Sequence, residues 1–379
     1  MDDMERKEAV RPWSDSYLSP ETPQGSREYP AGKKELIFGA AILLLSFFLC
    51  NSIVYGGFNL GFSLGLCLCI LCGSGYLLAG GHKLTPYSSI LLLLSVLVVG
   101  ESVNGARRWI NIAGLQFQPS EIAKFTMIVL FAKLTRSFGA GAKEFRYGVL
   151  GFGSALLGIL VPLALEKHLS AIMLMGMVAV VMMFVAGTSP KWLLAGAGAA
   201  VVFVVVYISF MGYAGDRVTA WLYPEGDPSD TGYQILQSLY AIGSGGLFGL
   251  GLGKSRQKYL YLPFQYNDYI FAVVCEELGL VGALLIVALF AALILRGYWI
   301  ALHARDRFST VLASGLVTLI AVQTVLNLCV VTNLLPSTGI ALPFFSYGGT
   351  ALAVNLGEMG IVLSISRQRD EIKKQEEIL

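Results

Sequence analysis

The chain has 379 residues, of which 55% are hydrophobic and only 14% are charged. Soluble domains carry roughly 25% charged residues, so the composition excludes an ordinary soluble enzyme. A net charge of +2, from 27 Lys and Arg against 25 Asp and Glu, is too small to favour nucleic acid as a partner. The composition therefore indicates an integral membrane protein.

The first 34 residues are polar and show no apolar periodicity. A signal peptide has its hydrophobic region directly after a short basic start, so we interpret residues 1–34 as a disordered cytoplasmic tail. Ten apolar segments follow, and a spanning helix needs about 20 such residues. Because unpaired backbone is costly in lipid, we predict an all-α integral membrane protein with ten transmembrane helices over 35–366. The predicted spans are 35–56, 60–80, 87–103, 119–134, 147–165, 170–187, 191–211, 268–302, 309–333 and 347–366.

The basic residues predict the orientation of these helices. With the amino terminus inside, the inner segments hold 19 of the 27 Lys and Arg residues. The positive-inside rule then places both ends, including a short tail at 367–379, in the cytoplasm. The largest outer segment is 212–267, a large extracytoplasmic loop between helices 7 and 8. Ser and Gly interrupt its two apolar patches, so we expect short helices and glycine turns there, lying in the interface, and no eleventh span.

The outer segment 104–118 leads into a cluster of charged residues. Arg108 and Trp109 lie on the outer side, and Ser120 is predicted to cap the helix that follows. Glu121 falls in the first turn of that helix, with Lys124 one turn deeper on the same face. One interpretation is an interfacial Trp anchor and a Glu121–Lys124 pair that stabilises the helix end. The other is an anion site, because Arg and Lys both suit phosphate oxygens.

Asp268 opens the long apolar helix of the eighth span at the outer surface. One interpretation is that Asn267 or Asp268 caps the helix, and the other is that Asp268 is a general base whose pKa is raised by partial desolvation. Glu276 and Glu277 follow about 12 Å deeper, where we expect them to be neutral, paired or facing a wet cavity. Polar residues of the last two spans, Gln323, Asn327, Asn355 and Glu358, are interpreted as interhelical hydrogen-bonding groups.

Four strings in the chain occur together and in order. They are RRWINIAGLQFQPSEIAKF, SDTGYQILQSLYAIGSGGLFGLGLGKSRQK, NDYIFAVVCEELG and LLPSTGIALPFFSYGGT. Together they resemble the SEDS family (shape, elongation, division, sporulation) of membrane glycosyltransferases that polymerise peptidoglycan, and the resemblance covers about 35–366. The string GLGKSRQKYLYLP is similar to the FtsW and SpoVE branch. The chain departs from the family pattern at Phe264, where Glu is common after Leu-Pro, and at Glu166, Lys167 and His168, where Gln-Pro-Asp is frequent.

The resemblance implies lipid II as substrate, the undecaprenyl pyrophosphate-linked disaccharide pentapeptide of the outer leaflet. Asp268 would act as the general base with inversion at the donor anomeric carbon, while Arg108, Lys124 and Arg217 would neutralise the pyrophosphate. A divalent cation, Mg²⁺ or Mn²⁺, would suit the same charge, although the sequence offers no dedicated metal ligands. Further substrate-binding candidates in the matching strings are Trp109, Gln118, Ser120, Glu121, Ser346 and Tyr347.

The resemblance also implies a place and partners. A class B penicillin-binding protein transpeptidase, with other division or elongation complex proteins, would work beside the chain in the bacterial cell membrane. Two other functions stay open: a flippase or transporter for lipid II, and a scaffold for the transpeptidase. The charged candidates gather at the outer surface and not at the bilayer midplane, where transporters bind their substrates, so the pattern favours the polymerase.

Overall fold

The structure is a computed structural model. It describes residues 93, 101–103, 106–112, 115–166, 168–198, 212–226, 232–259, 261–263 and 265–376. The expected tail at 1–34 and the spans 35–56 and 60–80 lie outside these residues. So do most of the span 87–103 and the second half of the span 191–211.

Six long helices make up most of the described structure. Four described helical stretches are long and apolar enough to cross a membrane: Arg146–Leu165, Ile270–Leu302, Arg307–Val331 and Gly349–Gln368. They agree with four predicted spans, and α7 is a shorter apolar helix at the position of a fifth. The bounds are α5 Pro119–Phe138, α6 Phe152–Leu165 after the π-helix η2 Arg146–Gly151, α7 Leu169–Val185, α11 Ile270–Leu302, α12 Arg307–Val331 and α13 Gly349–Glu376.

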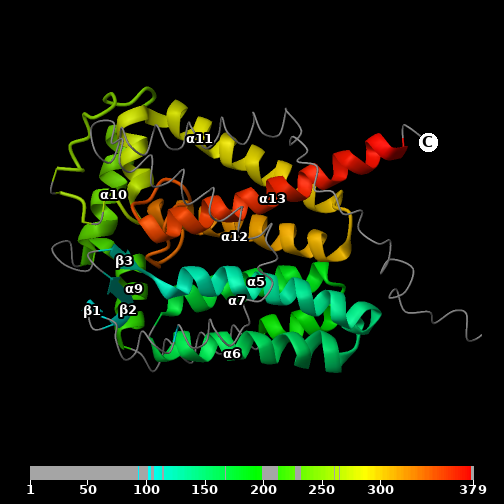
Figure 1. The fold of residues 1–379 in the computed structure, drawn as a ribbon. Helices are drawn as coiled ribbons and strands as arrows, with labels where there is room; N and C mark the ends of the chain where they lie inside the picture. The colour runs from blue at the N-terminus through cyan, green and yellow to red at the C-terminus, as the bar shows by residue number, and fades with distance from the viewer. Residues whose placement is uncertain are drawn as a thin grey trace, which may run out of the picture.

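The long helices run roughly along one axis (Figure 1). Helix α12 packs against α5, α7 and α11, and residues on all its sides are buried, which explains its apolar sequence with small Ser, Gly and Ala positions. Helices α9 (Gly212–Leu222) and α10 (Tyr233–Ser244) gather with three short strands at one end of this bundle, and α13 ends at the opposite end. The predicted outer segments therefore lie together.

The segment expected to be an outer loop at 104–118 forms a small sheet instead. Strands β1 (Glu101–Val103), β2 (Ala106–Ile112) and β3 (Leu115–Phe117) pair antiparallel in chain order. The sequence places Asn104-Gly105 between the first two strands, a dipeptide typical of two-residue hairpins. The described part of the chain is therefore mostly helical, as predicted, with one small sheet, and the predicted span 87–103 overlaps β1.

The large outer segment contains short helices, as predicted. Besides α9 and α10 it holds the 3₁₀ turn Pro224–Gly226, followed by glycine turns at 245–253. Helix α11 begins at Ile270 and is broken at Gly279, which has φ 66° and ψ −169°. At the other end of the chain α13 continues as a helix to Glu376, through most of the predicted tail at 367–379.

Candidate functional site

Asp268 lies at the amino-terminal end of α11, against the loop of residues 332–348 that joins α12 to α13. Asn327 of α12 donates from Nδ2 both to the Asp268 carbonyl, at 2.7 Å, and to the Ile340 carbonyl, at 2.8 Å. Because Asn327 is buried, these bonds join the start of α11 to the loop 332–348 with few competing water molecules. The loop is non-helical, so its backbone groups need such partners.

Ser346 and Tyr347 fasten the same loop to the residues before Asp268. The Ser346 hydroxyl donates to the Asn267 carbonyl and accepts from the Leu342 N–H, both at 2.7 Å. The Tyr347 N–H donates to the Tyr266 carbonyl at 2.7 Å, while the Tyr347 side chain is 58% exposed. The Ser346 hydroxyl is thus already used within the protein, whereas the Tyr347 side chain is largely exposed.

Arg217 of α9 supplies the positive charge beside Asp268. Its Nη1 donates to the Ser337 carbonyl of the loop 332–348 at 3.0 Å. Burial raises the pKa of the half-buried Asp268 carboxyl to about 6, and Arg217 acts in the opposite direction. A carboxyl with this pKa is ionised at neutral pH but remains close to accepting a proton, as a general base requires.

Asp268 does not cap α11. The N-cap residue is Tyr269, and no side chain accepts a hydrogen bond from the first turn of the helix. The Asp268 side chain instead faces the loop 332–348, where a Cβ on Gly339 would lie 4.0 Å from its Oδ2. The capping interpretation is therefore wrong within the described structure, because the N-cap position belongs to Tyr269 and no side-chain cap hydrogen bond is made there.

A second charged group lies on α5. Glu121 and Lys124 form an ion pair of 2.7 Å, one turn apart, and both side chains are buried. Glu358 of α13, only 1% exposed, lies within electrostatic range of both. Neither Glu358 oxygen has a hydrogen-bond partner in the described part of the chain. The predicted pair is confirmed, and a third carboxyl belongs to its surroundings.

Ser120 is not the cap of α5, contrary to the prediction. The N-cap is Gln118, which uses no side-chain hydrogen bond, and Pro119 occupies the first helical position. The first N–H of the helix is therefore absent, which reduces the need for a capping hydroxyl. Ser120 is 2% exposed, and its Oγ has no partner among the described residues. Ser120 directly precedes Glu121 and therefore lies next to the group formed by Glu121, Lys124 and Glu358.

Arg108 of β2 connects the sheet to the turn between α6 and α7. It acts electrostatically on Glu166, whose pKa is raised to about 7 by burial, with Arg108 opposing that rise. Burial, together with the charges of Arg108 and Lys124, lowers the pKa of His168 to about 3. His168 is therefore neutral. Trp109, the next residue in the strand, is half-buried.

The candidates thus form two groups at the same end of the bundle. Asp268 and Arg217 lie around the loop 332–348, whereas Arg108, Glu121 and Lys124 lie around α5. The start of α7 lies between them: the Ser170 hydroxyl donates to the Thr338 carbonyl of the loop, and the charges of Arg108 and Lys124 act on His168.

Glu166 and His168 were not predicted as site residues, although their departure from the family pattern was the available signal. Among the described residues, no three His, Cys, Asp or Glu side chains are placed to hold a metal ion.

Comparison with known proteins decides the family. Residues 60–371 match the family described as cell cycle protein, which comprises FtsW, RodA and SpoVE. The chain belongs to the FtsW/RodA/SpoVE family. The predicted resemblance is confirmed, and the Asp268 and Lys124 groups both lie inside the matched residues.

Several members of the FtsW/RodA/SpoVE family resemble the chain over most of its length. It is 42% identical over 278 residues to the probable peptidoglycan glycosyltransferase FtsW of Geobacter sulfurreducens, covering 73% of this chain and 74% of that one. It is 40% identical over 288 residues to stage V sporulation protein E of Bacillus subtilis, covering 75% and 78%. A solved peptidoglycan synthase complex that coordinates polymerization and crosslinking contains a chain of similar fold, with a TM-score of 0.72 and 28% identity, covering 90% of this chain and 99% of that one.

Proposed function

We propose that this peptidoglycan glycosyltransferase polymerises lipid II and that Asp268 is its general base. The observation that carries the proposal is the position of Asp268, held at the outer end of α11 by Asn327 and facing the loop 332–348 that Arg217 also binds. A base and a cation on one loop match a reaction that removes a proton and releases a diphosphate.

The proposed reaction joins two disaccharides by one displacement. The Asp268 carboxylate takes the proton from the 4-hydroxyl of the acceptor GlcNAc, and the oxygen attacks C1 of the donor MurNAc. The bond from C1 to the lipid pyrophosphate breaks, and the pyrophosphate leaves with the bonding electrons. Attack opposite the leaving group converts the α-linked donor into a β-1,4 glycan, so one carboxylate is enough for the inversion.

Three cations are proposed to stabilise the departing pyrophosphate. Arg217 is best placed for the first charge that develops, because it shares the loop 332–348 with Asp268. Arg108 and Lys124 would receive the rest of the diphosphate, together with the side chains of Trp109 and Gln118. Cations already fixed in a partly dry site stabilise charge more strongly than mobile ones in water, and Lys124 is fixed by its pair with Glu121.

The proposed function also fixes the arrangement in the membrane. Ten spans with both termini in the cytoplasm would place the Asp268 end of the bundle at the outer leaflet, where lipid II is displayed. The opposite end of α13 supports this arrangement, because it leads into a carboxyl-terminal segment with four Lys and Arg residues. We propose a class B penicillin-binding protein as partner, since polymerised strands must be cross-linked.

The test is polymerisation of lipid II by purified protein in nanodiscs. Asp268→Asn keeps the size of the side chain but removes its basicity, so we expect glycan synthesis to fall by at least about a thousandfold. Glu225→Gln is the matched control, because Glu225 is an exposed carboxylate in the same outer loop. Normal polymer from folded Asp268→Asn protein would remove Asp268 from the mechanism. Lipid II flipping in proteoliposomes that survives Asp268→Asn, without any polymer, would favour the flippase.

A further inference from the structure

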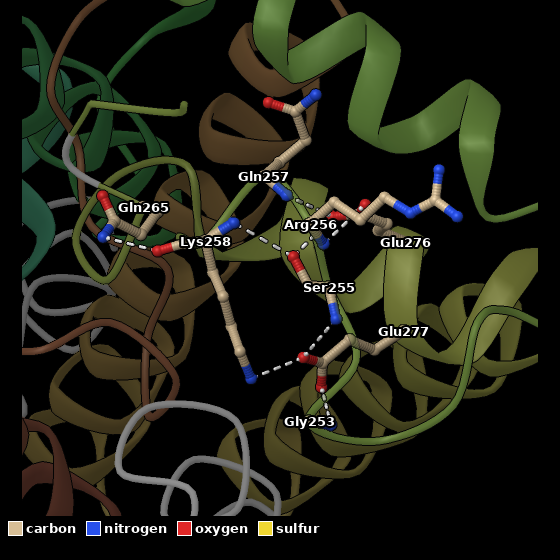
Figure 2. Close-up of polar contacts among 8 residues, drawn as sticks. All are labelled: Gly253, Ser255, Arg256, Gln257, Lys258, Gln265, Glu276 and Glu277. Carbon is tan, nitrogen blue, oxygen red and sulfur yellow. Dashed lines mark hydrogen bonds and ion pairs between the residues drawn. The ribbon is translucent and has the colours of Figure 1, made fainter. Parts of the chain in front are cut away.

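Buried charge also occurs outside the site just described, on the outer turns of α11. Glu276 and Glu277 are consecutive residues, and both are 0% exposed. A buried carboxylate without partners costs several kcal/mol, so the pair requires donors. Figure 2 shows both side chains turned toward residues 253–258 of the large outer loop.

Glu277 binds the start of this segment. Its Oε2 accepts from the Gly253 N–H at 2.9 Å, and its Oε1 accepts from the Ser255 N–H at 3.3 Å. The buried Lys258 ammonium also donates to Oε1, at 2.8 Å. One carboxylate therefore holds two backbone groups and neutralises one cation.

Glu276 binds the residues in between. Its Oε1 accepts from the Arg256 N–H at 3.0 Å, while its Oε2 accepts from the Ser255 hydroxyl at 2.5 Å and from the Gln257 N–H at 3.3 Å. All four oxygens of the two carboxylates are thus used, mostly by backbone N–H groups. We call Glu276, Glu277 and their partners in residues 253–258 the carboxylate clamp.

The backbone of the outer loop is joined to α11 at the same level. In an unbroken helix the N–H groups of Leu280 and Val281 would reach the carbonyls of Glu276 and Glu277. Here they donate to the carbonyls of residues 246 and 247, at 2.9 and 3.1 Å. The carbonyls of 276 and 277 accept from the N–H groups of residues 250 and 251 instead, at 2.9 and 3.0 Å. Four bonds between loop and helix therefore replace two bonds within the helix.

We propose that Glu276 and Glu277 are positioning residues for the glycosyl transfer. Through the carboxylate clamp they hold the outer loop on α11 and thereby fix residues 265–268, which end in Asp268. This inference rests on the proposed role of Asp268 as general base. It assigns a task in the reaction to two carboxylates that themselves lie away from the reacting atoms.

The connection from the clamp to Asp268 is short and hydrogen-bonded. Gln265, three residues before Asp268, donates from Nε2 to the Lys258 carbonyl at 3.1 Å (Figure 2). The Leu262 N–H donates to the Gln257 carbonyl at 2.9 Å. The segment from Lys258 to Asp268 is therefore attached to α11 at both ends: Lys258 belongs to the clamp, and Asp268 directly precedes the helix. The turns of α11 between Ile270 and Glu277 keep these two attachment points at a fixed distance.

The clamp can be opened without changing the shape of its side chains. In the double variant Glu276→Gln and Glu277→Gln, each residue presents an NH₂ group where an oxygen had accepted hydrogen bonds. Lys254 and Arg256 provide a direct readout, because both are exposed trypsin sites and the peptide N–H groups after them, of Ser255 and Gln257, are held by the clamp. The full chain in nanodiscs is assayed for trypsin cleavage and for lipid II polymerisation.

We expect cleavage after Lys254 and Arg256 to be at least about tenfold faster in the double variant, because charged hydrogen bonds are lost. We expect kcat to fall about tenfold with KM for lipid II within about twofold, because binding groups are untouched while the base is less well placed. The acid limb of the kcat profile should move to lower pH, since a looser Asp268 is better hydrated and its pKa falls toward the ordinary value. Arg217 and Tyr269 are the groups that the described structure sets near Asp268, and neither is changed.

A milder variant covers the case in which the double variant fails to fold. Lys258→Met removes the ammonium from Glu277, which keeps its bonds to the Gly253 and Ser255 N–H groups, so the same changes are expected at about threefold. Glu225→Gln, an exposed carboxylate of the same outer loop, should change none of these quantities.

Two outcomes would overturn the inference. Faster cleavage with unchanged kcat, KM and pH profile would mean that the clamp only stabilises the loop. Unchanged cleavage would mean that the clamp does not hold the segment at all. The Asp268→Asn experiment decides separately whether Asp268 is the base, so a failure of that role can be distinguished from a failure of the clamp.

Discussion

Asp268 and Arg217 form a pair whose behaviour with pH can be predicted. Burial raises the pKa of Asp268 to about 6 and Arg217 opposes this rise, so kcat should increase with pH through about 6 and level off above it. Below that pH the carboxyl already carries a proton and cannot accept one. Arg217→Ala removes the opposing charge, so the acid limb should move upward by about one pH unit. Lys254→Ala, which removes an exposed outer cation, should leave the limb in place, and a limb that does not move in Arg217→Ala would contradict the pairing.

Glu121 and Lys124 allow structure and function to be separated. Lys124→Met leaves a buried carboxylate without its partner and should cost about 3–5 kcal/mol of unfolding free energy. Adding Glu121→Gln removes that isolated charge, so the double variant should regain most of the thermal stability. We expect it to polymerise lipid II at least about tenfold more slowly, because the cation proposed to bind diphosphate is gone. A double variant with normal activity would show that the pair only stabilises the start of α5.

Single residues also show what a sequence can predict. Opposite charges three residues apart on a helix predicted the Glu121–Lys124 pair, because the geometry of one turn is enough. The tasks of Ser120 and Ser346 could not be predicted, because a hydroxyl takes its partner from whatever the fold places beside it. Glu166 and His168 were visible only as departures from a pattern, since their surroundings come from a strand more than fifty residues earlier.

At the scale of elements, the break in α11 depends on Gly279. Its φ of 66° and ψ of −169° belong to a region open essentially to glycine, and a Cβ there would lie 2.3 Å from the Gly249 nitrogen. Gly279→Ala should therefore lower the unfolding free energy by at least about 2 kcal/mol. Gly243→Ala is the matched control, because Gly243 lies inside α10 with nothing within 4 Å of its Cβ. That change should stabilise the protein by about 0.5–1 kcal/mol, and thermal unfolding in nanodiscs measures both.

Hydropathy predicted the long helices well but not their interruptions. The predicted span 268–302 starts two residues before α11 and ends at the same residue, and the span 309–333 is shifted by two residues from α12, because apolar length is what lipid demands. The break at Gly279 leaves the run of apolar residues intact, so no window average could reveal it. The sheet at 101–117 was missed because β1, Glu-Ser-Val, was counted as the end of the apolar span 87–103, although Asn104-Gly105 was a hairpin signal.

At the scale of the whole molecule, the site is assembled from distant parts of the chain. The loop 332–348 receives hydrogen bonds from α7, α9 and α12, through Ser170, Arg217 and Asn327, with Trp221 of α9 adding a bond to the Asn333 carbonyl. Ser238 of α10 donates to the Val331 carbonyl, just before the loop, at 2.9 Å. The sequence could name most of these candidates and predict that they share one side of the membrane. It could not divide them into an Asp268 group and a Lys124 group, because that division depends on where α7 begins.

The exchange of hydrogen bonds at Gly279 bears on how the protein is made. Residues 246–251 leave the ribosome before α11, so during synthesis their backbone groups lack the partners that residues 276–281 later provide. Until the two segments meet, residues 276–281 can complete their own helical bonds, so we expect α11 to be inserted as a straight helix. The bend at Gly279 should then form only when residues 246–251 dock onto it. We therefore expect this end of the bundle to reach its final shape after α11 has been inserted.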